Sequence, residues 1–346
     1  MGWEHVLYFM TKKYLSLQTM RLFAALGVFQ YHLWNNYLGV PFLHPGTDFF
    51  FVLVGFVAAV SQSRYIATGG WWNYIWGRYV RLYVTFIPVF ILYILAGRDP
   101  LSTEYVLKSF FLVPIHDQLP LVGPTWMLSL FLVFYWLFSL AFLFRNEKVL
   151  IPVFAIWGVG CIFITWLRWE PAFASDWFRI IFDIRNVEFI FGYIAGKLIL
   201  NRRVGNLTAA WSLPIGIATL LISSVWYNAV THDMEGSGRI FLYGLPITLI
   251  AMGLAGLEQH GVNNSVVRVV THPWLVWLGN ISYVLFLVHN MILRLWDTVI
   301  PITPAQVPLI IVVVFAVAGI GYQFWERPVL GYIRQRTLLA KRDYSL

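Results

Sequence analysis

Charged residues are scarce in this chain of 346 residues. They account for 12% of it, whereas hydrophobic residues account for 59% and the mean hydropathy is +0.70. An ordinary soluble domain carries roughly 25% charged residues. The composition therefore excludes a soluble globular domain and predicts an integral membrane protein that is embedded in the lipid bilayer.

Cysteine and metal-ligand patterns are also nearly absent. Cys161 is the only cysteine and lies in an apolar run, which excludes an intrachain disulfide and a thiolate cluster. The eight histidines are scattered without ligand spacing, so we expect no metal. The first residues, MGWEHVLYFMTKKYLSLQTM, contain no small-residue cleavage site behind a short apolar core, and we expect the first helix to be retained. Internal repeats and polar linkers are missing as well, so we expect a single transmembrane domain over residues 1–346, with residues 326–346 as a short basic tail.

Long apolar runs are what the sequence has instead. A transmembrane helix needs about 20 mostly apolar residues, and the candidate runs are 15–37, 46–63, 79–97, 126–144, 149–167, 179–200, 209–227, 239–257, 274–295 and 306–325. We expect an all-α integral membrane protein with about ten transmembrane helices in one bundle. Of the 24 Lys and Arg residues, sixteen fall at the termini or in even-numbered loops, six in the opposite loops and two inside spans. This bias predicts that both termini are cytoplasmic, and it explains the net charge of +8 without a nucleic acid partner.

The first run, MRLFAALGVFQYHLWNN, holds two residues that are costly inside a membrane, Arg21 and His32. Their separation of eleven positions, at about 100° each, brings them to one helix face at depths that differ by about 16 Å. A ligand that touches both is long and thin, with its anionic end at the cytoplasmic Arg21. A snorkelling arginine and a histidine satisfied by a neighbouring carbonyl remain an open alternative.

Asp48 follows at the outer start of the second run, in HPGTDFFFVLVGF. A tight hairpin brings it close to the outer end of the first run. We therefore expect its carboxylate to fix the tautomer of His32 and to raise the basicity of that imidazole. The alternative is that Asp48 caps the N-terminus of its helix.

Two further pairs of charged residues lie in or beside the apolar runs. Arg185 and Glu188, in FDIRNVEFIFGY, are spaced i,i+3 and are able to neutralise each other or to frame a polar cavity. Arg78 and Arg81, in WGRYVRLYVTFIP, share one face at the cytoplasmic start of a span. That geometry suits phosphate groups, although ordinary positive-inside charge also explains either arginine.

Polar side chains recur in the run GNISYVLFLVHN, which contains Ser282, Tyr283 and His289; helix packing is an open alternative for all three. The outer loop over residues 98–125 contains YVLKSFFLVPI, which is too short to span the membrane. We expect this segment to form a helix at the membrane interface.

Taken in order along the chain, these segments resemble the acyltransferase-3 family of membrane acyltransferases, which modify cell-surface glycans. Arg21 and His32 match the family's motif of Arg, ten residues and His. Later family motifs are similar to GTDFFFVLVGF, RYVRLYVTFIP, GPTWMLSLFLVFY, RNVEFIFGY, LGNISYVLFLVH and ERP. The chain departs from the family pattern at Val54, where a serine is common, and at Phe131, where many members have a glutamate that bears on the acceptor.

The resemblance implies transfer of an acyl group, most often acetyl, from cytoplasmic acyl-CoA to a hydroxyl of a cell-surface polysaccharide or its lipid-linked precursor. The bacterial cytoplasmic (inner) membrane is the implied location, with polysaccharide-assembly enzymes as partners. His32 is then the general base or an acyl relay, and Asp48 orients it. The implied donor-binding residues are Arg21, Arg78 and Arg81, and those that bind the acceptor or support the site are Arg185, Glu188, Trp126, Ser282, Tyr283 and His289. The rival hypotheses are a transporter or flippase for a glycan or its lipid-linked precursor, and a purely structural or sensory membrane protein.

Overall fold

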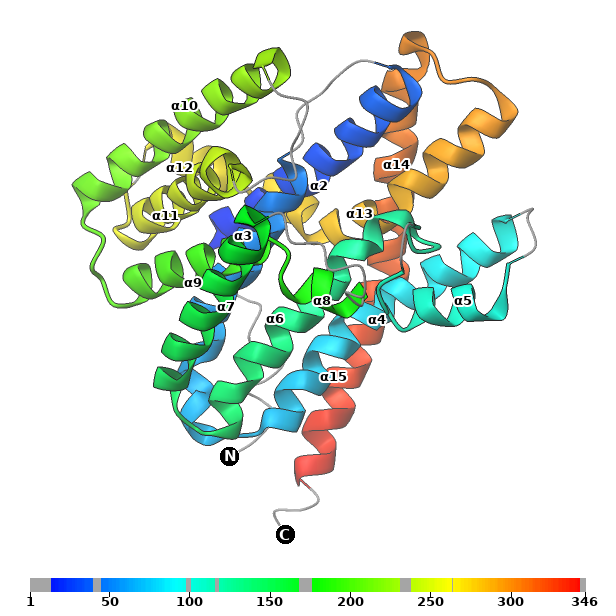
Figure 1. Cartoon of the computed structure of the whole chain (residues 1–346). Coiled ribbons are helices and arrows are strands. Elements are labelled where there is room, and N and C mark those ends of the chain that lie inside the picture. The colour runs from blue at the N-terminus through cyan, green and yellow to red at the C-terminus, as the bar shows by residue number, and fades with distance from the viewer. Residues whose placement is uncertain are drawn as a thin grey trace. The chain divides into compact units, whose positions relative to one another are not determined.

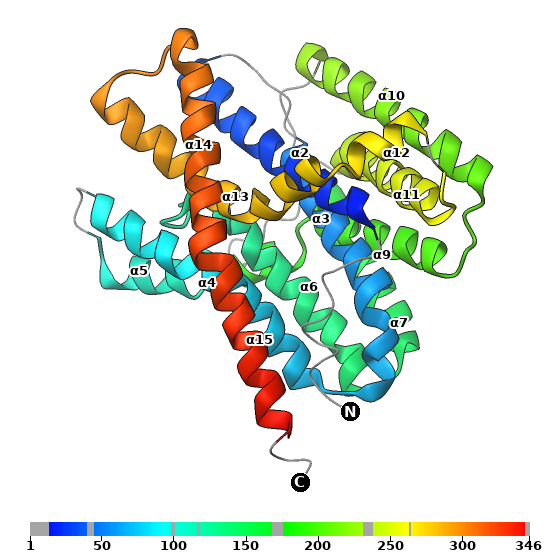
Figure 2. The ribbon, with the colours of Figure 1, turned by 180° about the vertical axis from the view of Figure 1, so that it is seen from behind.

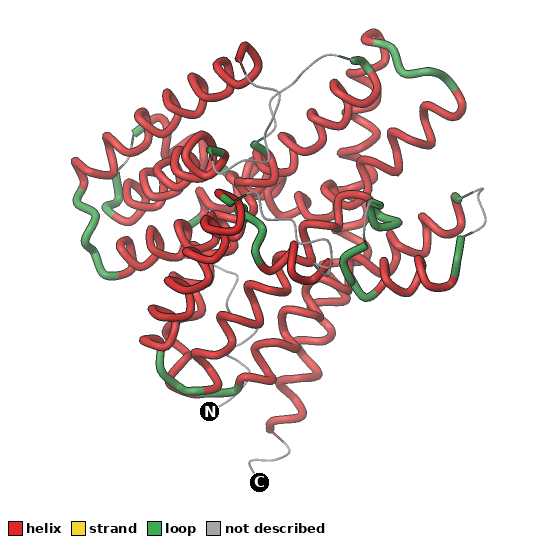
Figure 3. Tube along the Cα trace, in the orientation of Figure 1, coloured by secondary structure: helices red, strands yellow, loops and turns green. Residues whose placement is uncertain are grey.

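The computed structural model describes residues 14–39, 45–97, 101–115, 118–167, 176–230, 238–262 and 264–342. These residues form helices joined by short connections, and none of them is in a strand (Figure 3). The expected all-α fold is confirmed.

The α-helices (Figure 1) are α2 (Leu15–Tyr31), α3 (Gly46–Val57), α4 (Trp71–Ala96), α5 (Thr103–Phe110), α6 (Trp126–Leu143), α7 (Leu150–Trp166), α8 (Asp176–Ile181), α9 (Asn186–Leu200), α10 (Asn206–Val230), α11 (Leu245–Gln259), α12 (Ser265–Val270), α13 (Pro273–Val299), α14 (Val307–Gly321) and α15 (Arg327–Arg342).

Helices of membrane-spanning length dominate the described part of the chain. The segments that are long and apolar enough to cross a membrane are Trp71–Ala96, Gly123–Leu143, Glu147–Trp166, Asn206–Trp226, Ile240–Gln259, Pro273–Val299 and Pro304–Ile333. A further apolar helical segment, Gly46–Gln62, is shorter. The chain is thus a multi-pass membrane protein. The total of about ten spans and the side on which the termini lie stay predictions, and some of the basic residues behind them, such as Lys12 and Arg168, lie outside the described residues.

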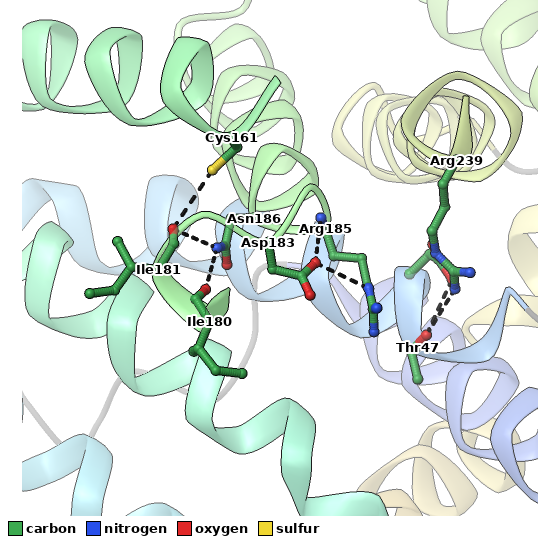
Figure 4. Close-up of polar contacts among 9 residues, drawn as sticks. Thr47, Cys161, Ile180, Ile181, Asp183, Arg185, Asn186 and Arg239 are labelled. Carbon is green, nitrogen blue, oxygen red and sulfur yellow. Dashed lines mark hydrogen bonds and ion pairs between the residues drawn. The ribbon is translucent and has the colours of Figure 1, made fainter. Parts of the chain in front are cut away.

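The sixth expected span, residues 179–200, is not one helix. Helix α8 ends at Ile181 and α9 begins at Asn186. Polar side chains between them replace the helical hydrogen bonds: Asp183 Oδ1 accepts the backbone N–H of Arg185 at 2.9 Å, and the Asn186 amide donates to the carbonyls of Ile180 and Ile181 at 2.8 and 3.0 Å (Figure 4). Such local side-chain bonds offer the backbone an alternative to the helix. Because α9 has 15 residues, it is about 22 Å long, which is shorter than the hydrocarbon core.

The described chain divides into two compact units, each built from separate stretches of sequence. The first contains residues 65–147 and 281–346, and the second contains residues 12–64 and 148–280. Neither unit is contiguous, so neither corresponds to a domain that a single cut would release. We describe each unit by itself.

Close helix packing in the second unit depends on glycine. A Cβ atom added at Gly55 of α3 would overlap the carbonyl oxygen of Phe189 in α9, and one added at Gly192 would overlap the carbonyl oxygen of Val52. Small residues let membrane helices approach this closely. The backbone of Gly46, at the start of α3, likewise lies against Gly27 and Val28 of α2. Helix α3 is therefore held between α9 on one side and the last turns of α2 on the other.

The start of α2 is fixed by a carboxylate from another helix of the same unit. The backbone N–H groups of Leu15 and Ser16 donate to Glu258, at the end of α11, at 2.6 and 3.0 Å, and the Ser16 hydroxyl donates to it at 2.6 Å. The first N–H groups of a helix have no partner within the helix, so this carboxylate supplies one. From this anchor the helical run continues through α2 into a π-helical turn, His32–Tyr37, so residues 15–37 are helical, as expected. This run is not among the segments found long and apolar enough to cross a membrane, and its position as the first span stays a prediction.

In the first unit, side chains of other helices bond to the backbone of α4. The Tyr283 hydroxyl of α13 donates to the carbonyl of Leu82 at 2.9 Å, and the indole of Trp325 donates to that of Val84 at 2.6 Å. Trp325 belongs to a π-helical turn, Tyr322–Glu326, through which α14 continues into α15 (Figure 2). The expected short helix in the outer loop is present as α5, whose start is capped by Ser102; its position at a membrane surface stays a prediction.

Candidate functional site

His32 begins the π-helical turn at the end of α2. Its imidazole is half-buried, and its Nδ1 lies 3.0 Å from Nδ2 of Asn36, one turn further along the helix. π-Helical turns within helices are frequent at functional sites, because they change the direction in which side chains point. The sequence pattern does not indicate Asn36, because an amide near the end of an apolar run carries no charge that would mark it.

Arg21 lies in the same helix, about three turns before His32, and is also half-buried. Its guanidinium donates to the side chain of Gln18 at 3.2 Å. Both residues therefore belong to one continuous helical run, as the spacing predicts. Their depths in the membrane stay predictions.

Asp48 is fully buried and is bound by an arginine. Arg239 donates from Nε and Nη2 to the two carboxylate oxygens of Asp48, at 2.8 and 2.7 Å, and Nη2 also lies 3.3 Å from the Thr47 hydroxyl (Figure 4). Such a bidentate arrangement is the strongest form of a charge-assisted hydrogen bond. The interpretation of Asp48 as an N-cap is wrong, because α3 begins at Gly46, with Pro45 as its N-cap, and Asp48 lies inside the first turn. The orienting role of Asp48 toward His32 stays a prediction.

Arg239 is the residue of this site that the sequence did not indicate. Its place in the sequence predicts a positive charge of an outer loop. In the structure, Arg239 is only 5% exposed and immediately precedes the π-helical turn Ile240–Gly244. Its partner Asp48 lies 191 positions away in the sequence. One signal pointed to this pairing: both residues stand at the starts of even-numbered spans, which are on the same side of a membrane.

Glu188 lies beside this ion pair. It is fully buried in the first turn of α9, and its charged neighbours include Asp48, Arg239 and Arg185. Neither of its carboxyl oxygens has a hydrogen-bond partner among the described residues. Gly244 makes room for it, since a Cβ atom there would lie 2.8 Å from Glu188 Cγ.

Arg185 has Asp183 as a close partner and is also a charged neighbour of Glu188, so the expected pair of Arg185 with Glu188 stays a prediction. Arg185 Nε lies 3.1 Å from Oδ1 of Asp183, in the connection between α8 and α9 (Figure 4). Arg185 is the N-cap residue of α9, and its carbonyl accepts the backbone N–H of Glu188 at 3.0 Å.

In the first unit, the two arginines expected to bind phosphate have different surroundings. Arg81 Nη2 lies 3.4 Å from Oε1 of the fully buried Glu326, whose other oxygen accepts from the Thr85 hydroxyl at 2.9 Å. The Arg78 guanidinium lies over the rings of Tyr74 and Tyr135, 5.4 and 5.8 Å from their centroids. Its Nε is buried and has no hydrogen-bond partner among the described residues. Arg81 is thus largely neutralised within the protein, whereas aromatic rings hold Arg78.

Comparison with known proteins agrees with these motifs. A family model described as an acyltransferase domain matches residues 14–323 of the 346. The chain belongs to the acyltransferase-3 family. Neither the curated proteins nor the solved structures contain a match to it. The resemblance deduced from the sequence is confirmed, and it makes the protein a membrane acyltransferase.

The remaining expected residues of this acyltransferase lie in the first unit. Tyr283 and Ser282 are buried in α13, and the hydroxyl of Tyr283 ties that helix to α4. His289, also buried, has its Nδ1 3.1 Å from the carbonyl of Leu285, one turn earlier in its own helix. Trp126 is the half-buried first residue of α6. The contacts of Tyr283 and His289 agree with the helix-packing alternative, and their roles toward an acceptor stay predictions.

The two departures from the family pattern fall in both units. Val54 is half-buried in α3, one residue before the close contact at Gly55. Phe131 is buried in α6, and its ring centroid lies 6.4 Å from that of Tyr135, the residue that supports Arg78. At this position the acyltransferase has an apolar contact to an arginine-binding aromatic group, where many relatives carry a carboxylate.

Proposed function

We propose that this protein is an O-acyltransferase of the bacterial cytoplasmic membrane. It moves an acyl group, acetyl or a longer one, from cytoplasmic acyl-CoA to a hydroxyl of a cell-surface polysaccharide or of its lipid-linked precursor. The observation that carries the proposal is the family match over residues 14–323, which includes Arg21 and His32 on one continuous helical run. Enzymes that assemble the polysaccharide are its proposed partners, because they supply the acceptor.

The chemistry centres on His32. As a general base, its imidazole takes the proton of the acceptor hydroxyl while the oxygen attacks the thioester carbonyl. The carbon–sulfur bond then breaks, and the departing CoA thiolate takes the proton from the imidazolium, so the reaction releases no net proton. In the alternative relay, the imidazole attacks the thioester carbonyl, the carbon–sulfur bond breaks, and CoA leaves as its thiolate. The acceptor hydroxyl then attacks the carbonyl of the acyl-histidine, the carbon–nitrogen bond breaks, and the hydroxyl proton balances the thiolate as the free thiol.

The donor is held by its phosphates. Arg78 is the better phosphate ligand of the two arginines in α4, because Arg81 is already paired with Glu326 and aromatic rings pre-orient Arg78. Within the second unit, Arg21 adds positive charge on the helical run that leads to His32, and this arrangement suits a slender acyl-CoA arm whose thioester lies at the imidazole. The remaining expected residues bind the acceptor or stabilise the site; they are Asp48, Arg185, Glu188, Trp126, Ser282, Tyr283 and His289.

The test is acyl transfer by the purified, full-length protein. Labelled acetyl-CoA and a panel of candidate glycans are supplied in detergent or nanodiscs, and labelled glycan is measured by mass. We expect transfer by the wild type, loss of transfer in His32→Ala, and wild-type transfer in His272→Ala, a matched control at an exposed histidine. Movement of unmodified glycan across vesicles without acyl transfer would establish the transporter instead.

A second measurement separates the two routes. Under single turnover without acceptor, the relay leaves a labelled acyl group on His32, which mass spectrometry of a peptide digest detects. Direct transfer leaves the protein unlabelled and shows sequential bisubstrate kinetics. Comparison of the surface glycan of a deletion strain with that of its parent then identifies the acyl group and the polymer from the missing mass.

A further inference from the structure

The contacts within the second unit indicate which side chain positions the imidazole of His32. Both carboxylate oxygens of Asp48 accept hydrogen bonds from Arg239. The contact at 3.0 Å on the ring of His32 is instead with Asn36, at Nδ1. The π-helical turn His32–Tyr37 contains both residues, so one local segment fixes their relative position.

An amide has properties at this position that a carboxylate lacks. A neutral imidazole carries one N–H, and a side-chain amide has a donor and an acceptor that a half-turn of its terminal group exchanges. With Nδ2 toward the ring, as in the structure, Asn36 donates to Nδ1 and the ring proton lies on Nε2. With Oδ1 toward the ring, Nδ1–H donates to Asn36 and Nε2 keeps its lone pair. Only this second arrangement makes Nε2 a base or a nucleophile.

We propose that Asn36 is a positioning residue that holds His32 at Nδ1 and selects its tautomer, leaving Nε2 for the reaction. Oδ1 faces the ring when Nε2 takes the acceptor proton or attacks the thioester, and the Nδ2 orientation is the resting form. This assignment rests on the proposed function of His32.

Three variants of Asn36 separate tautomer selection from packing. Asn36→Leu keeps the approximate volume and removes both hydrogen-bonding groups, so we expect kcat to fall about 10- to 100-fold, the range found when a histidine loses its supporting hydrogen bond in metal sites, with KM for acetyl-CoA unchanged. Asn36→Asp accepts only, which fixes Nδ1–H, so it retains more activity than Asn36→Leu. Its carboxylate also stabilises the imidazolium, which moves the acid limb of the pH profile of kcat/KM to higher pH. Asn36→Gln, with the same amide on a longer stem, restores part of the loss.

The matched control is Gln30→Leu. Gln30 is an amide of the same helical run, and it accepts the indole N–H of Trp34 at 2.6 Å. We expect its kcat and its pH profile to stay those of the wild type. Wild-type kcat in Asn36→Leu would overturn the proposal, and so would equal losses in Asn36→Leu and Asn36→Asp without movement of the acid limb.

A spectroscopic measurement tests the contact independently of activity. Protein labelled with ¹⁵N-histidine reports which ring nitrogen carries the proton, and the signals of His32 are assigned by their absence in His32→Gln. We expect Asn36→Leu to change the proportions of the two tautomers and Asn36→Asp to give Nδ1–H. Unchanged His32 signals in both variants would overturn the assignment. Loss of acyl transfer by the wild type itself would instead refute the proposed function, while the nitrogen shifts still test Asn36.

Discussion

Replacement of Asp48 by asparagine tests the buried ion pair that joins α3 to the start of the π-helical turn Ile240–Gly244. The substitution keeps the shape of the side chain and removes its charge. Arg239 is 5% exposed, so its guanidinium would remain buried opposite a neutral amide, and the two charge-assisted hydrogen bonds to the carboxylate would be weakened or lost. A structural role of Asp48 therefore predicts a large loss of stability from a change of very small volume.

The size of the loss follows from the contacts. Two hydrogen bonds to charged groups, at 2.7 and 2.8 Å, are worth about 1.5–3 kcal/mol each. Removal of one partner from a buried pair costs about 3–5 kcal/mol, because the other charge stays buried. With an unfolding entropy of about 2 cal/mol/K per residue over 346 residues, Asp48→Asn lowers Tm by about 4–7 °C.

Glu188→Gln is the matched control for this experiment. Glu188 is as deeply buried as Asp48 and lies beside the same guanidinium, yet neither of its oxygens has a hydrogen-bond partner among the described residues. The substitution leaves both hydrogen bonds of the Asp48–Arg239 pair in place, and we expect its Tm to stay within about 1–2 °C of the wild type, equivalent to about 1 kcal/mol. The double variant Asp48→Asn with Arg239→Gln removes both charges of the pair and is expected to recover part of the loss, because neither member of the pair is left opposite a neutral partner.

The assay is thermal unfolding of the purified protein in one detergent, followed by intrinsic tryptophan fluorescence, with size-exclusion profiles to confirm that each variant is monodisperse. The reasoning is refuted if Asp48→Asn unfolds at the wild-type temperature, or if Glu188→Gln unfolds as early as Asp48→Asn. In the second case burial of a polar side chain, and not its pairing, would set the stability.

Three further perturbations are open to test. Gly192→Ala places a Cβ atom on the backbone of α3, so we expect a loss of about 1–3 kcal/mol from overpacking and a lower Tm, whereas Gly205→Ala, with open space around it, is neutral. Glu258→Ala removes three hydrogen bonds from the start of α2 and is expected to cost about 1–2 kcal/mol in the same assay. Arg78→Ala raises KM for acetyl-CoA with Tm unchanged, whereas Arg81→Ala lowers Tm because it leaves a buried carboxylate unpaired.

Each of these expectations has a definite contrary result. Equal Tm values for the two glycine variants would mean that α3 and α9 move apart at no cost. A wild-type Tm in Glu258→Ala would mean that water replaces the carboxylate at the start of α2. Equal effects of the two arginine variants on KM, measured as initial rates against acetyl-CoA concentration, would refute the division of roles between them.

The sequence predicted those features that depend on local patterns. Apolar length sufficed for the all-α fold and for the helical run over residues 15–37 that carries Arg21 and His32. It failed at residues 182–185, because the polar residues there looked like charges inside a span, whereas Asp183 and Asn186 form the hydrogen bonds of a helix break. Periodicity counts polar residues along a helix and does not show that their side chains bond to the backbone.

Long-range pairs were the other features that the sequence did not predict. Arg239 and Asp48 are 191 positions apart, and Arg81 and Glu326 meet across most of the chain. The positions of charges along the chain limit which of them lie on the same side of a membrane but do not identify the partner of each, so Arg78 and Arg81 are equivalent at the level of sequence. The difference between them depends on which aromatic ring or carboxylate another helix brings to each.

The ion pair agrees with the predicted alternation of the helices across the membrane, whereas the side on which each helix begins stays a prediction. Asp48 and Glu188 lie in the first turns of α3 and α9, and Arg239 stands at the start of the π-helical turn that leads into α11. Three helix starts therefore meet in one place, which requires the three helices to run in the same direction from it. The alternating topology predicts this arrangement, because the three helices belong to even-numbered spans, which all begin on the outer side.

Cysteine labelling tests that orientation directly. Gly205 and Gly238 are exposed, have open space for a side chain, and lie beyond opposite ends of α10. In a Cys161→Ser background, an impermeant maleimide added to intact cells should label Gly238→Cys, and it should label Gly205→Cys only after the membrane is opened. The reverse pattern would place the Asp48–Arg239 pair at the cytoplasmic side. His32, at the end of α2 that packs against the start of α3, would then lie at the donor's entrance, and the separation in depth between Arg21 and His32 would no longer match a ligand that enters from the cytoplasm.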